Sequence, residues 1–177
     1  MFEEFKARAE AANAGVRRFV GRKDAVAFIL SALRQEGISE AGGRALWASG
    51  SFLDGLDRTS MARDGSISFE VTREAAALAK VGVSQMDYAI AETGTLVQAC
   101  TSAEQRVVSM LPPVHIAIVP SSRILPDLRA LLARMSPKDF GYLAFITGPS
   151  RTADIERVLT IGVHGPERLH VVCVDDL

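Results

Sequence analysis

The sequence contains only two cysteines, Cys100 and Cys173, and both lie in apolar stretches. Two cysteines cannot form the framework of a disulfide-rich secreted protein, nor by themselves a four-cysteine iron–sulfur cluster or a closed zinc site. The three histidines are scattered along the chain without the spacing of metal ligands. We therefore expect neither a metal centre nor a bound cofactor.

An excess of charge of either sign is also missing, because 20 basic residues face 21 acidic ones. Without surplus Lys and Arg the chain is poorly suited to neutralise a phosphate backbone, which argues against nucleic-acid binding as its main task. No apolar run approaches the roughly 20 residues that a membrane-spanning helix needs. Residues 1–6 are acidic and lack the basic and apolar regions of a signal peptide, so we expect a cytoplasmic protein.

Glycine-rich loops of the GxGxxG or Walker A type are absent, so neither dinucleotide nor P-loop nucleotide binding is indicated. Internal repeats, low-complexity segments and long linkers are absent as well. The 177 residues, of which 48% are hydrophobic and 23% charged, have the size and composition of one globular domain. We predict a single domain over residues 1–177.

Helical and strand patterns alternate along the chain. Apolar residues at helical spacing predict helices over residues 2–13, 23–36, 73–80, 123–135 and 152–159. Apolar or alternating runs predict strands over residues 16–20, 44–49, 66–71, 87–92, 95–99, 115–119, 141–147 and 169–174. The runs at 115–119 and 141–147 are continuously apolar, as expected for buried strands. This order predicts an α/β fold with a mostly parallel sheet that helices cover on both faces.

Local signals mark the ends of several of these elements. Thr72 is placed to cap the helix over residues 73–80, and Gly37 stands where a helix C-terminal glycine belongs. Two apolar runs flank the Thr-Gly turn at Gly94, which predicts a hairpin or a strand–turn–strand unit.

The first candidate site is this turn, where a carboxylate ends an apolar strand. Glu92 could act as a base, a nucleophile or a hydrogen-bond anchor, so we predict it as a catalytic candidate. A glycine lets backbone N–H groups approach a ligand. The candidate ligand-binding residues here are Thr93, Gly94 and Thr95. The alternative is a plain hairpin turn with a solvated glutamate.

The second candidate is the Gly-Pro turn after the strand at 141–147. Ligands of open α/β sheets bind beyond the carboxyl ends of strands, at helix N-termini. We predict that this turn binds a small carboxylate or phosphate. The candidate residues are Gly148, Ser150, Arg151 and Thr152. Asp154 and Glu156 oppose an anion and leave helix capping as the alternative.

The histidines and a nearby arginine complete the list of candidates. His164 precedes a Gly-Pro turn and is a candidate acid or base, although a structural role is the more common one. His115 and His170 fall in apolar strands, where we interpret them as core or strand-edge residues. Arg106 and Ser109 are candidates for the same rim, with a solvated arginine as the simpler interpretation. We predict that one cleft beyond the strand carboxyl ends collects Glu92, Thr93, Ser150, Thr152 and His164.

Four segments together resemble the LUD domain family, and within it the lactate-utilization protein C type. They are GVSQMDYAIAETGT at 82–95, LPPVH at 111–115, ITGPSRTADIE at 146–156 and GVHGP at 162–166. The resemblance covers most of the chain, from about Phe5 onward. Members of the family usually carry an additional N-terminal helical segment, and this sequence starts close to where that segment would end.

The resemblance implies a fold like that of the NagB/RpiA/CoA-transferase group. It also implies a non-redox part in the oxidation of L-lactate to pyruvate, alongside iron–sulfur partner subunits that would hold the redox centres. Two alternatives stay open, because a fold does not determine a reaction. One is a stand-alone enzyme with CoA-transferase-like or cyclo-ligase-like chemistry at Glu92. The other is a sensor or binding module for a small carboxylate or phosphate.

Overall fold

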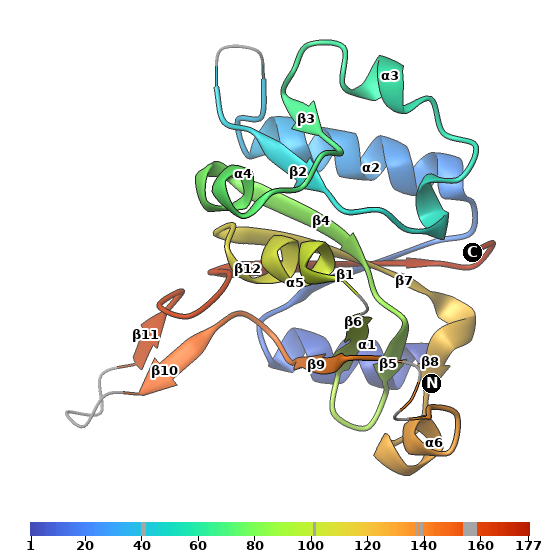
Figure 1. Cartoon of the computed structure of the whole chain (residues 1–177). Coiled ribbons are helices and arrows are strands. Elements are labelled where there is room, and N and C mark those ends of the chain that lie inside the picture. Colours follow the sequence, from blue (N-terminus) through green and yellow to red (C-terminus); the bar gives the residue numbers. More distant parts are fainter. Residues whose placement is uncertain (40–41, 101, 137, 139, 154–158) are drawn as a thin grey trace.

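The computed structural model describes residues 1–39, 42–100, 102–136, 138, 140–153 and 159–177. The helices are α1 (Phe2–Ala11), α2 (Arg22–Gln35), α3 (Arg58–Met61), α4 (Arg73–Leu78), α5 (Ala103–Met110) and α6 (Leu128–Leu132), with 3-10 turns at Ser51–Leu53 and Ser121–Arg123. The strands are β1 (Gly15–Phe19), β2 (Ala45–Trp47), β3 (Ile67–Ser68), β4 (Val81–Gln85), β5 (Tyr88–Ile90), β6 (Thr95–Cys100), β7 (Val114–Pro120), β8 (Ile124–Leu125), β9 (Tyr142–Ile146), β10 (Arg151–Ala153), β11 (Leu159–Ile161) and β12 (Arg168–Val174). Figure 1 shows their arrangement.

The main sheet has six strands in the order β1-β12-β7-β4-β2-β3, and every neighbouring pair runs parallel. All residues of β7 are buried, in agreement with its continuous apolar run. The predicted α/β fold with a mostly parallel sheet is therefore confirmed. The strand β3 is shorter than the predicted run over residues 66–71.

Two apolar layers hold this sheet. On one face, Ile29 and Leu33 of α2 belong to one buried apolar cluster with Trp47 of β2. On the other face, Phe5 of α1 packs in a cluster with Val171 of β12. Figure 1 shows α2 behind the strands and α4 and α5 in front of them. Burial of each such large side chain contributes roughly 1.5–3 kcal/mol.

The local end signals agree with the structure. The Thr72 hydroxyl accepts a hydrogen bond from the Ala75 N–H at the start of α4. Gly37 follows α2 with a φ of 76°, the left-handed conformation that favours glycine after a helix. Gly94 joins β5 to the antiparallel β6 with a φ of 65°. The predicted hairpin is therefore confirmed.

A second, smaller sheet has the order β8-β5-β6-β9. The apolar run over residues 141–147 belongs here, as β9, which pairs antiparallel with β6. Tyr142 and Phe145 of β9 are each 48% exposed. The prediction of a buried strand in the parallel sheet was therefore wrong for this run. Apolar composition reveals neither the sheet nor the direction in which a strand pairs.

One central strand, β4, was missed, since Gly82 and Ser84 interrupt its apolar pattern. The glycine is needed there because a Cβ at Gly82 would lie 2.1 Å from the Val108 carbonyl oxygen of α5. The strand therefore has no side chain at this position, and this allows the backbone of α5 to approach closely.

Two predicted helices are wrong. Residues 123–135 contain the end of a 3-10 turn, β8 and only the short α6, which Asp127 caps by accepting from the Ala130 N–H. At both described ends of the predicted helix over residues 152–159 the chain is extended, since Thr152 and Ala153 belong to β10 and Leu159 belongs to β11, and these strands pair antiparallel. Asp154 and Glu156 lie outside the described residues. In Figure 1 this hairpin extends away from the rest of the molecule.

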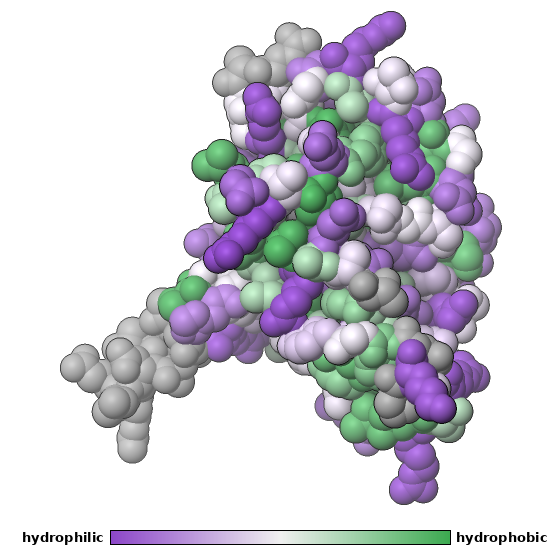
Figure 2. Space-filling view, viewed as in Figure 1, coloured by the Kyte–Doolittle hydropathy of each residue, from purple (hydrophilic) through white to green (hydrophobic). Residues whose placement is uncertain are grey.

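The surface is mixed in character. Figure 2 shows apolar side chains over α6, where Leu128 and Leu132 are 46% and 58% exposed. Within the part of the chain that the structure describes, no helix is long and apolar enough to cross a membrane.

Candidate functional site

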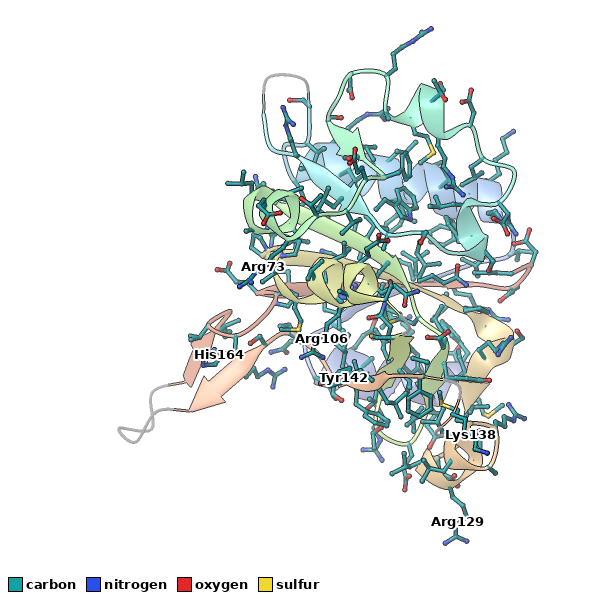
Figure 3. All side chains as sticks on the ribbon, in the orientation of Figure 1. Arg73, Arg106, Arg129, Lys138, Tyr142 and His164 are labelled. Atoms are coloured by element: carbon teal, nitrogen blue, oxygen red, sulfur yellow. The ribbon has the colours of Figure 1, made fainter. Side chains whose placement is uncertain are left out.

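A cavity of about 390 Å³ lies where α5, β9 and the loop before β12 meet. Figure 3 labels Arg106, Tyr142 and His164, one residue from each of these three segments. The lining residues are Arg106, Ser109 and Met110 from α5, Tyr142 and residues 144–146 from β9, residues 147–151 after β9, and residues 164–166 before β12. Its volume falls in the range of sites for small ligands.

About half of the predicted site residues line this cavity. Gly148, Ser150, Arg151 and His164 all line it, as do the two rim candidates of α5. For Thr152 the structure describes the backbone, in β10, and nothing is described of the side chain. These residues come from segments far apart in the sequence, which the fold brings together.

The other half, the turn between β5 and β6, does not line the cavity. Glu92 and Thr93 are exposed, and the Glu92 N–H donates to the Pro126 carbonyl. Gly94 packs against α1, because a Cβ there would lie 2.3 Å from the Ala9 nitrogen. Glu92 is thus exposed at the hairpin and apart from the cavity, and its predicted catalytic role stays a prediction.

A chain of hydroxyls nevertheless connects this turn to the cavity. The Thr95 hydroxyl lies 2.7 Å from that of Thr93 and 2.7 Å from that of Thr147. Thr147 lines the cavity. The turn and the cavity thus share one end of the small sheet. A substitution at Thr95 would therefore remove hydrogen bonds to both.

The cavity lies at the amino edge of the parallel sheet and not beyond the carboxyl ends of its strands. The Ser150 N–H donates to the Pro166 carbonyl over 2.8 Å, and the Glu167 N–H donates to that of Pro113. Both prolines lead into the amino ends of strands, β12 and β7. The predicted location was wrong because it rested on placing the run at 141–147 in the parallel sheet.

The anion-binding turn also differs from its prediction. The described residues after Gly148 continue into the strand β10, so the free N–H groups of a helix start are not available at this turn. The Ser150 N–H is already bonded to Pro166, and the Arg151 guanidinium donates to the Ala12 carbonyl. Any anion would therefore be held by side chains that face the cavity rather than by a helix N-terminus.

The described lining of the cavity carries positive charge and no carboxylate. The Arg106 guanidinium carbon lies 3.9 Å from the centroid of the Tyr142 ring. Stacking on the ring face orients the guanidinium and leaves its N–H groups for a ligand. Within the described ranges, Arg106 takes part in no ion pair. Arg151 and His164 add further donors.

Sequence comparison places the chain among known proteins. A family model for the LUD domain matches residues 2–174. The chain belongs to the LUD domain family. The resemblance that the four sequence segments indicated is thereby confirmed.

Curated relatives of this LUD domain are named lactate utilization protein C. That of an Exiguobacterium species is 40% identical over 114 residues, which is 61% of this chain and 50% of the relative. That of Halalkalibacterium halodurans is 38% identical over 109 residues, 58% of this chain and 47% of the relative. The chain spans about half the length of the curated relatives it matches.

A solved structure shares the fold. The crystal structure of a duf162 family protein from Deinococcus radiodurans superposes with a TM-score of 0.66 at 21% identity, covering 98% of this chain and 95% of that one. The likeness to the NagB/RpiA/CoA-transferase group stays a prediction.

A buried polar network lies behind the cavity of this LUD domain. The Ser109 hydroxyl reaches the Gln98 side-chain oxygen, 3.3 Å away. The Gln98 amide nitrogen lies 3.5 Å from the Ser84 hydroxyl, which in turn lies 2.8 Å from His115 Nε2. Only the polar residues Gln98 and Ser84 inside otherwise apolar strands signalled this network in the sequence.

His115 is a core residue, as predicted, but its hydrogen bonding is incomplete. The side chain is fully buried, and this burial lowers its pKa from 6.5 to about 3. Within the described part of the chain, its Nδ1 atom has no hydrogen-bond partner. The imidazole is therefore neutral at physiological pH and carries an unsatisfied polar atom.

The two thiols are poor nucleophiles in this environment. Both Cys100 and Cys173 are buried and free. Burial raises the pKa of Cys100, and it raises that of Cys173 to about 12. Both therefore stay protonated, in keeping with their prediction as packed apolar residues.

Proposed function

We propose that this LUD domain takes part in lactate utilization as a component that binds a small carboxylate and carries out no redox step itself. The names of its relatives support the pathway. The positively charged cavity supports the ligand class. The two buried, protonated cysteines support the non-redox role, because they offer no reactive thiolate.

The observation that carries the proposal is the cavity lining. Arg106, Arg151 and His164 surround a space without a single described carboxylate. An arginine stacked on an aromatic ring presents a planar fork that matches the two oxygens of a carboxylate. The hydroxyls of Ser109 and Ser150 can contact a second polar group of the same ligand.

The redox partners are part of the proposal. Two cysteines are too few for an iron–sulfur cluster, so the electrons from lactate would pass to separate iron–sulfur subunits. The purified chain alone is then expected to show no lactate oxidation. It is expected to co-purify with iron–sulfur proteins from cells grown on lactate. Oxidation of lactate by the chain unaided would contradict this division of labour.

Direct titration tests the binding step. We expect L-lactate or pyruvate to bind the purified protein in calorimetry, and Arg106→Gln to weaken that binding about tenfold or more, the effect of losing a charged hydrogen bond. Arg129→Gln is the matched control, because Arg129 lies on α6 in another part of the molecule (Figure 3). Equal loss in both variants would indicate unspecific attraction to positive charge.

The stand-alone enzyme is less well supported. Its chemistry needs Glu92 at the ligand, whereas Glu92 is exposed and absent from the cavity lining. A sensor would use the same cavity without turnover. The search for partners separates a sensor from a pathway component.

A further inference from the structure

The hydrogen of the Ser109 hydroxyl is committed to the protein. Ser109 is only 4% exposed, and its Oγ lies 3.0 Å from the Arg106 carbonyl oxygen and 3.3 Å from Gln98 Oε1. Both oxygens can only accept, and a serine hydroxyl has a single hydrogen to donate. Whichever acceptor takes that hydrogen, it is no longer available to a ligand.

The orientation of the Gln98 side-chain amide supports this direction of the Ser109 hydrogen bond. Its Nε2 donates to the Gln85 carbonyl oxygen, 3.4 Å away. Reversing the side-chain amide would set two oxygens against each other at Gln85 and would place an N–H at Ser109. Because Gln98 is fully buried, water cannot relieve such a mismatch. The amide oxygen therefore faces Ser109.

The last hydrogen bond of this buried network joins Ser84 to His115. Ser84 accepts from Gln98, and we infer that it donates its own hydrogen to His115 Nε2, 2.8 Å away. A neutral imidazole that accepts at Nε2 carries its proton on Nδ1. Within this network the Ser109 hydroxyl donates its hydrogen to the protein and so offers a ligand only its lone pairs.

We propose that Ser109 makes the cavity selective for 2-hydroxy carboxylates over 2-oxo carboxylates, because its hydroxyl offers a ligand only lone pairs. This inference rests on the proposed binding of a carboxylate in the cavity. A ligand O–H donates to those lone pairs. A keto oxygen has no hydrogen to donate and meets them unfavourably.

The position of Ser109 on α5 supports this selectivity. Arg106 and Ser109 are three residues apart, so they share one face of the helix and lie side by side. A carboxylate held by Arg106 therefore brings the substituent on its C2 atom to the neighbourhood of Ser109. The cation binds the group that both acids share, and the serine contacts the group in which they differ.

The hydroxyls of Thr147 and Ser150, which also line the cavity, do not discriminate in this way. Thr147 shares its hydrogen bond with Thr95, and either oxygen can be the donor. For Ser150, no acceptor among the described residues holds the hydroxyl hydrogen, so the group can donate or accept. Both residues can contact either kind of ligand, so the preference for 2-hydroxy carboxylates depends on Ser109.

Three ligands of equal length test the inference by calorimetry. L-lactate has a hydroxyl on C2, pyruvate has a keto oxygen, and propionate has only hydrogens. We expect L-lactate to bind about threefold to tenfold more tightly than the other two, the range that one neutral hydrogen bond provides. In Ser109→Ala this preference is lost, while the propionate affinity changes less than about twofold.

Ser102→Ala is the matched control, because Ser102 lies exposed at the other end of α5 and makes no capping hydrogen bond. It is expected to keep the preference. Equal or tighter binding of pyruvate to the unmodified protein, or a preference that survives in Ser109→Ala, overturns the inference and leaves carboxylate binding standing. If none of the three acids binds, the proposed function fails and the inference with it. Should Ser109→Ala not fold, the three ligands on the unmodified protein still decide.

Discussion

The Arg106 guanidinium lies over the Tyr142 ring, 3.9 Å from its centroid, and so joins α5 to β9 across the rim of the cavity. Helix α5 packs on the parallel sheet, whereas β9 is an edge strand of the second sheet. The contact therefore connects two parts of the fold that no hydrogen-bonded ladder connects at this point. It also orients the cation that the proposed function requires.

Removing the ring should release that cation. We expect Tyr142→Leu to weaken lactate binding about twofold to fivefold, the effect of an exposed cation–π contact. Tyr142→Phe keeps the ring face and should retain the affinity. Calorimetric titration of both variants measures the difference. An equal loss in the two would show that the phenolic hydroxyl matters and the stacking does not.

The buried His115 should make stability depend on pH. Its pKa falls from 6.5 to about 3 on folding, so between these values the unfolded chain binds a proton that the folded chain does not. The free energy of unfolding therefore falls as pH drops through this window, by at most about 1.4 kcal/mol per pH unit from this residue. Urea denaturation at pH 7 and pH 5 measures the slope. His115→Gln should reduce it, and an unchanged slope would refute this cause.

The direction of the buried hydrogen bonds can be observed at the same residue. We expect the ¹⁵N chemical shifts of His115 to show a neutral ring protonated at Nδ1, because we infer that Ser84 donates to Nε2. The pattern should persist from pH 5 to 8, since a pKa of about 3 lies well below that interval. A proton on Nε2 would reverse the assignment at Ser84.

The close approach of α5 to β4 predicts a destabilising substitution. A Cβ at Gly82 would lie 2.1 Å from the Val108 carbonyl oxygen, so Gly82→Ala should lower the free energy of unfolding by about 1–3 kcal/mol. Gly141→Ala is the control, because the nearest atom to its Cβ would be 3.9 Å away. Thermal or urea denaturation compares the two variants. A neutral Gly82→Ala would mean that α5 shifts at little cost.

The exposed Glu92 supplies a test between the two kinds of function. Because it does not line the cavity, Glu92→Gln should change lactate affinity by less than about twofold, within the usual effect of a surface substitution. Carboxylate binding by the variant is measured as for the unmodified protein. A large loss would bring the CoA-transferase-like or cyclo-ligase-like alternative back into consideration.

About half of the candidate site could be predicted from the sequence. Ser150, Arg151 and His164 were recognised because turns with glycine, proline and polar residues stand out locally, and Arg106 and Ser109 because they precede a proline pair. Their convergence was predicted only in part, since Glu92 and Thr93 belong to a different surface. Gln98 and Ser84 were missed, because a polar residue in an apolar strand has no partner until the strands are assembled.

By itself, the sequence determined the local elements whose signals lie within a few residues: the apolar stripe of α2, the Thr72 cap, the turn at Gly94 and the buried run of β7. It also determined the family, through segments of characteristic residues. Only the tertiary structure decided the direction of β9, the hairpin of β10 and β11, and the position of the cavity at the amino edge of the parallel sheet. An apolar run satisfies either sheet equally well, and contacts between residues distant in sequence choose between them.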